Sequence, residues 1–183
     1  MEQIINSEPV RTTEEKGNLF RLTLLYGGGI AIIYIAIALI FYFAKSMDSA
    51  LYRFFGYLYW VAAVIFIQVQ YRKSLGGYMK YGQAIVATLT TMFFASLIVG
   101  IFIYIQNKFI APESIGNVML ATEEKLYEKG FSDDDISMSM QMFSRFMKPA
   151  FFAVMSVFST TVTGLVIGIV TGFFTKKEKP IFE

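Results

Sequence analysis

The chain has 183 residues, of which 55% are hydrophobic and 17% aromatic, and its mean hydropathy of +0.53 is high for a water-soluble domain. Its 16 Lys and Arg residues against 14 Asp and Glu residues leave a net charge of only +2, which excludes the basic surface of a nucleic-acid-binding protein. Cysteine and histidine are both absent, and this excludes disulfides, thiolate nucleophiles, histidine acid–base catalysis and the common zinc sites.

Residues 1–21 are polar and of mixed charge, which predicts a mobile tail or a short surface helix, and four apolar runs follow them. The runs cover residues 22–44, 54–70, 84–106 and 149–174, and none of them contains Asp, Glu, Lys or Arg. At about 1.5 Å per residue, about 20 helical residues cross a hydrocarbon core about 30 Å thick. Because backbone groups in lipid must be paired within a helix or a closed barrel, and these runs lack the alternation of barrel strands, we predict an all-α, polytopic membrane protein with four transmembrane helices.

The first run lies near the N-terminus, so a cleaved signal peptide is the alternative to a retained span. The apolar part of a signal peptide is ordinarily about 7 to 15 residues long, and residues 22–44 exceed that length. We therefore expect a transmembrane domain over residues 22–174, with Pro149 in the first turn of its last helix and a basic C-terminal tail at residues 175–183.

The connections at residues 45–53 and 71–83 are short, so consecutive helices should be antiparallel neighbours. With four spans, both termini lie on one side of the membrane. That side carries nine Lys and Arg residues and the other carries seven, together with seven acids in the long connection. The bias predicts that both termini are cytoplasmic.

Residues 107–149 are the longest connection and predict an extramembrane, periplasmic insertion of two short helices between the third and fourth spans. Pro112 can open the first helix, and Gly130 can end it in a left-handed cap. Ser132 can cap the second helix, with the Asp135 carboxylate reaching back as in a capping box.

The second of these helices has an apolar face with spacings of four, three and four residues. It consists of Ile136, Met140, Phe143 and Met147. The bilayer surface, the transmembrane bundle or a partner could cover it, and the methionines there would tolerate an imprecise fit. We expect this face to pack within the protein, and the alternative is that it binds a partner or a lipid.

Two short patterns suggest chemistry but have simpler explanations. The carboxylates of Asp133 and Asp135 have the spacing of a divalent-metal pair, although helix capping explains the same residues. The run from Gly27 to Gly29 resembles a phosphate-binding loop, but no Lys-Ser or Lys-Thr follows it, so we expect a kink or a close helix approach. We therefore predict no metal site, no cofactor and no catalytic residues.

Polar side chains are scarce in the spans. The absence of charged residues from the span cores argues against ion-coupled transport. Four glutamines, Gln68, Gln70, Gln83 and Gln106, fall near the span ends, where we expect interfacial hydrogen bonding.

The fourth span carries small residues at every fourth position. They are Ser156, Thr160, Gly164, Gly168 and Gly172, and they form a ridge that another helix can approach closely. In the third span, Ser96 and Gly100 form a shorter pair of small residues that could pack against this ridge. We expect packing inside one chain, and the alternative is contact with a second copy or another membrane protein.

The chain resembles the bacterial membrane family called domain of unknown function 4199. The resemblance rests on the four spans, the "YMKYGQAIVATL" entry to the third, its "YIQNKFIAP" exit, the acidic helical insertion, and the small-residue last span ending in "KKEKP". It implies a Gram-negative inner-membrane protein and supplies no activity or site residues.

These observations predict a non-enzymatic integral membrane protein that acts as a subunit or assembly partner through its ridge and its periplasmic helices. Its partners would be membrane lipids and either another membrane protein or a second copy, with no nucleic acid. One alternative is a small transporter or channel formed by oligomers. Another is an accessory subunit of a lipid-linked glycan enzyme whose catalytic part lies on a different chain.

Overall fold

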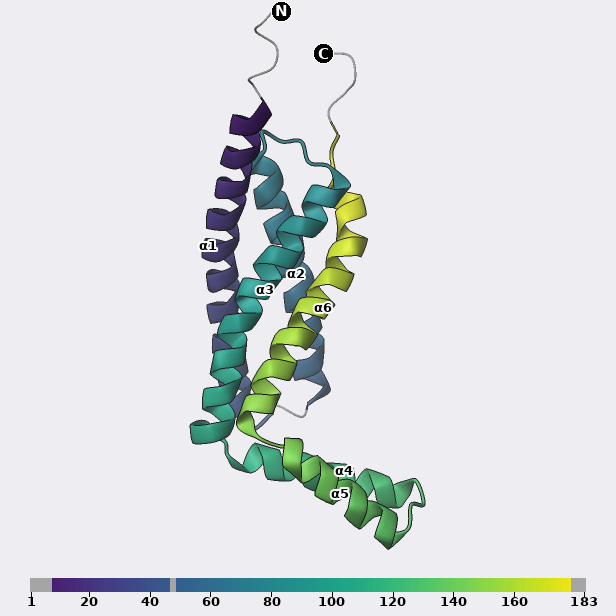
Figure 1. Cartoon of the computed structure of the whole chain (residues 1–183). Helices are drawn as coiled ribbons and strands as arrows, with labels where there is room; N and C mark the ends of the chain where they lie inside the picture. Colours follow the sequence, from purple (N-terminus) through teal and green to yellow (C-terminus); the bar gives the residue numbers. More distant parts are fainter. Residues whose placement is uncertain (1–7, 47–48, 179–183) are drawn as a thin grey trace, which may run out of the picture. The chain divides into compact units, whose positions relative to one another are not determined.

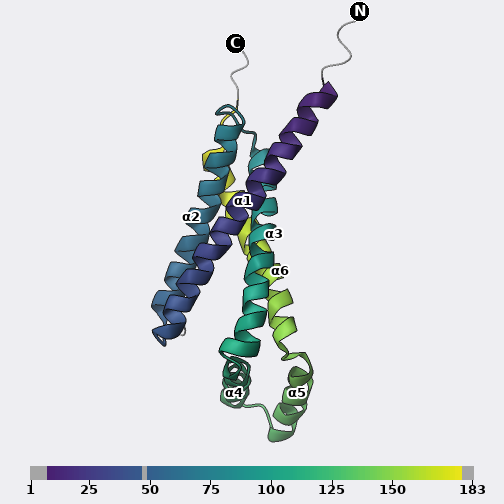
Figure 2. The same cartoon turned by 90° about the vertical axis from the view of Figure 1, so that its left-hand side faces the viewer.

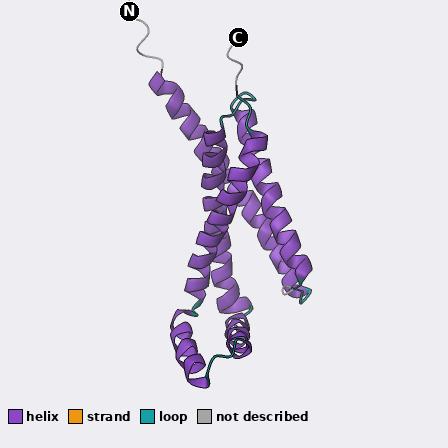
Figure 3. Cartoon of the chain, turned by 90° about the vertical axis from the view of Figure 1, so that its right-hand side faces the viewer, coloured by secondary structure: helices purple, strands orange, loops and turns teal. Residues whose placement is uncertain are grey.

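The computed structural model describes residues 8–46 and 49–178, with side chains from Leu19 onward. Its elements are α1 (Glu8–Phe43), α2 (Ala50–Ser74), α3 (Tyr81–Ile105), the π-helical turn η1 (Gln106–Ile110), α4 (Glu113–Glu128), α5 (Asp133–Phe146) and α6 (Pro149–Thr175) (Figure 1). All of these elements are helical (Figure 3). The all-α prediction is therefore confirmed for the described part of the chain.

Within the described residues, four helical segments are long and apolar enough to cross a membrane: Leu19–Phe43, Ala50–Ser74, Tyr81–Ile110 and Pro149–Thr175. This agrees with the four predicted spans, and Pro149 is the first residue of the last one, as expected. Of the two expectations for residues 1–21, a mobile tail or a short surface helix, the part described from Glu8 onward is helical, and α1 runs without a break into the first candidate span instead of forming a separate short helix. Residues 1–7 and 179–183, where the rest of the two predicted tails falls, lie outside the described residues.

The chain divides into two compact units, which are described separately. Unit 1 comprises residues 1–96 and 159–183 and holds α1, α2, the first part of α3 and the last part of α6. Unit 2 comprises residues 97–158 and holds the end of α3, η1, α4, α5 and the start of α6.

In unit 1, α1 and α2 pack against each other as the short connection between them predicted (Figure 2). The Tyr34 ring on α1 lies 4.9 Å from the Trp60 ring on α2, measured between centroids. The Tyr59 hydroxyl on α2 donates a hydrogen bond to the backbone carbonyl of Ile30 on α1. Aromatic and polar contacts therefore both join the two helices.

In unit 2, α4 and α5 lie side by side (Figure 2). Gly130 has a φ of +78°, in the left-handed region, and follows the end of α4 as predicted. Ser132 is the N-cap of α5, and its Oγ accepts a hydrogen bond from the Asp135 N–H at 3.3 Å. The Ser132 hydroxyl donates a hydrogen bond to Asp135 Oδ2 at 2.6 Å, whereas in a capping box the carboxylate would accept from the backbone N–H of Ser132.

Replacing Ser132 with alanine should lower the free energy of local unfolding at the start of α5 by about 1 kcal/mol, because the N-cap acceptor is lost. Amide hydrogen exchange of the first turn of α5, measured on the detergent-solubilised chain, should speed up about fivefold. Ser137→Ala is the matched control, since the Ser137 hydroxyl bonds the Asp134 carbonyl inside the helix and caps nothing. Equal exchange rates in the two variants would contradict this role of Ser132.

Candidate functional site

Three glycines on the predicted ridge of α6 pack against α3 within unit 1. The pairs are Gly164 with Met92, Gly168 with Thr88, and Gly172 with Tyr81. A Cβ atom built on these glycines would lie 2.5, 2.7 and 3.1 Å, respectively, from the nearest atom of that neighbour. The glycines therefore permit a close approach, and a larger residue at these positions would require the facing side chain or helix to shift. This side of α6 is covered by α3 of the same chain.

The contact between α3 and α6 in unit 1 also includes hydroxyl groups. The Ser96 and Thr161 side-chain oxygens lie 3.0 Å apart, within hydrogen-bond distance. Thr160, which was predicted for the ridge, is half-buried. In this turn of α6, the hydroxyl contact to α3 is therefore made by Thr161 and not by Thr160.

In unit 2, the end of α3 meets the start of α6 at Gly100. An added Cβ atom there would lie 2.6 Å from the Val157 side chain and 3.2 Å from the Ala153 carbonyl oxygen. The Ser156 hydroxyl donates to that same Ala153 carbonyl at 2.7 Å, within its own helix. Gly100 and Ser156 therefore belong to a close contact between α3 and α6 in this unit as well.

A buried glutamine joins three helices of unit 1. The Gln68 side chain on α2 is fully buried. Its Nε2 donates to Thr88 Oγ1 on α3 at 3.0 Å and to the Gly168 carbonyl on α6 at 3.1 Å, and its Oε1 accepts from Thr175 Oγ1 at 2.8 Å. The expected interfacial role is wrong for Gln68, because its polar atoms are satisfied inside the protein.

The connection after α2 is attached to the end of α6. Arg72 Nη1 donates to the Thr175 carbonyl at 2.9 Å, at the C-terminal end of α6. Met79 and Lys177 form an antiparallel bridge, with N···O distances of 2.7 Å from Met79 to Lys177 and 2.9 Å in the reverse direction. These bonds hold the connection beside the start of α3 and the end of α6.

A pocket of about 700 Å³ opens beside this bridge. It is lined by Leu75, Tyr78, Met79, Lys80, Tyr81, Gly82, Gln83, Lys177 and Glu178. The Lys177 ammonium lies 5.5 Å from the centroid of the Tyr78 ring, in cation–π range. Sequence reasoning did not single out this site, because its residues come from two segments about 100 positions apart whose proximity follows from the bridge.

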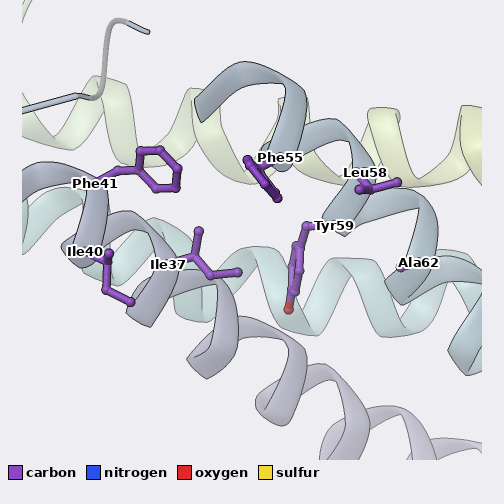
Figure 4. A pocket seen from close by; sticks show the side chains of 7 residues that line it. All are labelled: Ile37, Ile40, Phe41, Phe55, Leu58, Tyr59 and Ala62. Atoms are coloured by element: carbon purple, nitrogen blue, oxygen red, sulfur yellow. The ribbon is translucent and has the colours of Figure 1, made fainter. Parts of the chain in front are cut away.

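Two further pockets lie between α1 and α2, and their walls are apolar. One has a volume of about 350 Å³ and is lined by Ile37, Ile40, Phe41, Phe55, Leu58, Tyr59 and Ala62 (Figure 4). The other, of about 410 Å³, shares Tyr59 and Ala62 with the first. Most of the residues that line the two pockets are apolar, and Tyr59 lines both.

The predicted apolar face of α5 is the more buried side of that helix. Ile136 is buried, Met140 and Met147 are half-buried, and Phe143 is exposed. A different apolar stripe, of Met138, Met142 and Phe146, is 68%, 58% and 57% exposed. The predicted face therefore lies partly within the α4–α5 pair, and the more exposed surface is this second stripe.

The two patterns weighed for phosphate and metal binding have structural roles. A Cβ atom at Gly27 would lie 3.0 Å from the Thr91 carbonyl oxygen, so this glycine permits the close helix approach that was predicted. Asp133, Asp134 and Asp135 occupy the first turn of α5, where carboxylates complement the helix dipole.

Comparison with known proteins places the chain in a family without giving it an activity. No curated protein and no solved structure matches the chain. The model of one protein family matches residues 25–177, which is most of the chain and includes all of α2 to α6. On this match, the chain belongs to the family described as Protein of unknown function (DUF4199).

Proposed function

We propose that this chain is a non-enzymatic integral protein of the bacterial inner membrane that serves as a subunit or assembly partner of another membrane protein. In this proposal both termini are cytoplasmic, and the α4–α5 pair is periplasmic and carries the docking surface. The ridge of α6 serves packing within the chain, because α3 already covers its glycines.

One observation carries the proposal: the exposed stripe of Met138, Met142 and Phe146 on α5. These residues are four positions apart, so they follow one slowly drifting line along the helix. Methionine and phenylalanine are enriched in the cores of protein interfaces, and methionine adapts its shape to a partner. The stripe ends just before Pro149, where the last span begins, so a partner must also lie close to the membrane.

The charge of the α4–α5 pair favours a protein partner over the lipid surface. Residues 113–146 contain seven acidic and three basic residues. Helices that lie on anionic bilayers are instead rich in Lys and Arg on their polar face. The complementary partner would present an apolar groove with a basic rim.

Site-specific photocrosslinking in intact cells tests this docking surface. A photoreactive phenylalanine analogue at position 142 should give one discrete heavier product that contains a second, different protein. The same analogue at Glu124, an exposed position on α4, is the control and should give little of that product.

A paired substitution then tests whether the stripe provides binding energy. Met138→Ser combined with Met142→Ser should reduce co-purification of the crosslinked protein at least tenfold, since two exposed apolar anchors are lost. Gln141→Ser, on the same helix, should leave co-purification unchanged. Crosslinks to lipid alone would refute the protein-docking proposal, and crosslinks to a second copy alone would replace it with a homo-oligomer.

A further inference from the structure

We propose that the pocket beside the Met79–Lys177 bridge binds a phosphate group. This inference concerns unit 1 only and does not depend on the docking surface of α5. The ligand class is a phosphate ester or phosphate ion, from the headgroup of an anionic lipid or from solution.

The pocket is built by contacts that hold two distant segments together. Each partner of the Met79–Lys177 bridge donates one backbone hydrogen bond to the other, at 2.7 and 2.9 Å. The bridge keeps Lys80 and Lys177, which lie on separate segments, on the wall of one pocket. Two lysines on the wall of one cavity are a suitable pair for a phosphate, which lysine binds as a point charge.

The walls of the pocket add neutral donors to this pair of cations. The Tyr78 and Gln83 side chains both line it. Gln83 Oε1 accepts a hydrogen bond from the Lys80 N–H at 2.9 Å, which fixes the start of α3. The first turn of α3 also borders the pocket, and its backbone N–H groups and positive dipole end favour an anion there.

The charge balance around the pocket supports an anionic ligand. Glu178 is the one acidic residue on its wall, against Lys80 and Lys177. Arg72, Lys73 and Lys176 are near neighbours of the wall in sequence and raise the positive potential. An anion is therefore attracted even though one carboxylate lies at the site.

The phosphate group could reach the pocket from two sources, the headgroup of a lipid in the bilayer or inorganic phosphate in water. The pocket lies where α2 and α6 end and α3 begins, and each of these helices is a candidate membrane span (Figure 1). Headgroup phosphates lie at that level of a bilayer, whereas inorganic phosphate would enter from water. The pocket volume of about 700 Å³ accommodates either.

Calorimetric titration of the full chain in a neutral maltoside detergent tests the proposal. The ligands are dihexanoylphosphatidylglycerol, dihexanoylglycerol and inorganic phosphate, all at constant ionic strength. The phosphatidylglycerol should bind at one saturable site, and dihexanoylglycerol, which lacks the phosphate, should not. Competition by inorganic phosphate would show that the phosphate alone is recognised, whereas binding of the lipid without such competition would identify the headgroup as the source.

Charge-matched variants separate the pocket from general attraction to a basic surface. Lys80→Gln combined with Lys177→Gln should weaken binding at least about tenfold, because two charge-assisted hydrogen bonds are lost. Lys73→Gln combined with Lys176→Gln removes the same charge outside the pocket wall and should weaken binding less than about threefold.

A third variant blocks the pocket without changing its charge. Gly82 lines the pocket, and a Cβ atom added there meets no atom within 4 Å, so Gly82→Phe should be tolerated by the fold while it occupies the space. Phosphate-ester binding should fall at least about tenfold. Equal loss in the two lysine pairs, unchanged binding in Gly82→Phe, or equal binding of dihexanoylglycerol would each overturn the proposal.

Discussion

Gly168→Leu is expected to destabilise unit 1 strongly, because leucine would overpack the contact between α6 and α3. A Cβ atom at this position would lie 2.7 Å from Thr88 Cγ2 and 3.0 Å from Thr88 Cβ, before the rest of the leucine is added. The helices must separate to admit it, and the hydrogen bond from Gln68 Nε2 to the Gly168 carbonyl, now 3.1 Å, would be broken. Overpacking together with the lost bond should cost about 3 kcal/mol.

The measurement is the midpoint of unfolding when SDS is titrated into the chain in mild detergent. Gly168→Ala should give a smaller loss than Gly168→Leu, because only one methyl group meets Thr88. Val170→Leu is the control, since Val170 is on the same helix and 56% exposed. If Gly168→Leu unfolds at the same midpoint as Val170→Leu, the close contact between α3 and α6 is not what stabilises unit 1.

Gln68→Ala should have the second largest effect, a loss of about 2 kcal/mol. It removes three interhelical hydrogen bonds and leaves a cavity where a fully buried side chain stood. Interhelical hydrogen bonds in membranes contribute on average about 0.6 kcal/mol each, so the three bonds account for most of the loss and the cavity for the rest.

Gln68→Leu separates these two contributions. Leucine keeps most of the buried volume but none of the three hydrogen bonds, so it should cost about 1.8 kcal/mol in the same SDS titration, nearly as much as alanine. Gln70→Ala is the matched control, because it removes the same kind of side chain at a position that is only half-buried. Its loss of stability should be within about 0.5 kcal/mol. Similar midpoints for Gln68→Ala and Gln70→Ala would contradict a central role for the buried amide.

Local signals account for the predictions that the structure confirms. Pro149 starts α6 and Gly130 follows the end of α4 because their backbone preferences operate within a few residues. Ser132 caps α5 for the same reason, since the accepting oxygen and the donating N–H are three residues apart. None of these outcomes depends on which helix lies next to which.

Local signals did not predict which side of α5 is exposed. Its sequence offers two apolar stripes, one through Ile136 and Met140 and the other through Met138 and Met142, and both fit helical spacing. In the structure α5 packs against α4, Ile136 is buried, and Met138 and Met142 are exposed. Periodicity identifies an amphipathic helix, but the neighbouring helix decides which apolar residues remain available.

The burial of Gln68 could not be predicted from local sequence either. Its position near the end of an apolar run is compatible with an interfacial glutamine. Trp60, Val64, Ile67 and Tyr71 share its helix and are buried with it, and this common face was the available sign that Gln68 points into the protein. The structure shows that Gln68 points into the protein, because its side chain is hydrogen-bonded to Thr88 and Thr175.

The sequence by itself determined that the described part of the chain is helical, with four helices long and apolar enough to span a membrane, because the length of an uncharged apolar run and the backbone's need for internal hydrogen bonds are local properties. It also located the glycines that permit a close helix contact. Only the tertiary structure decided that α3 covers them, that Gln68 joins three helices, and that Lys80 and Lys177 share a pocket. These outcomes depend on contacts between residues far apart in the chain, which no local pattern specifies.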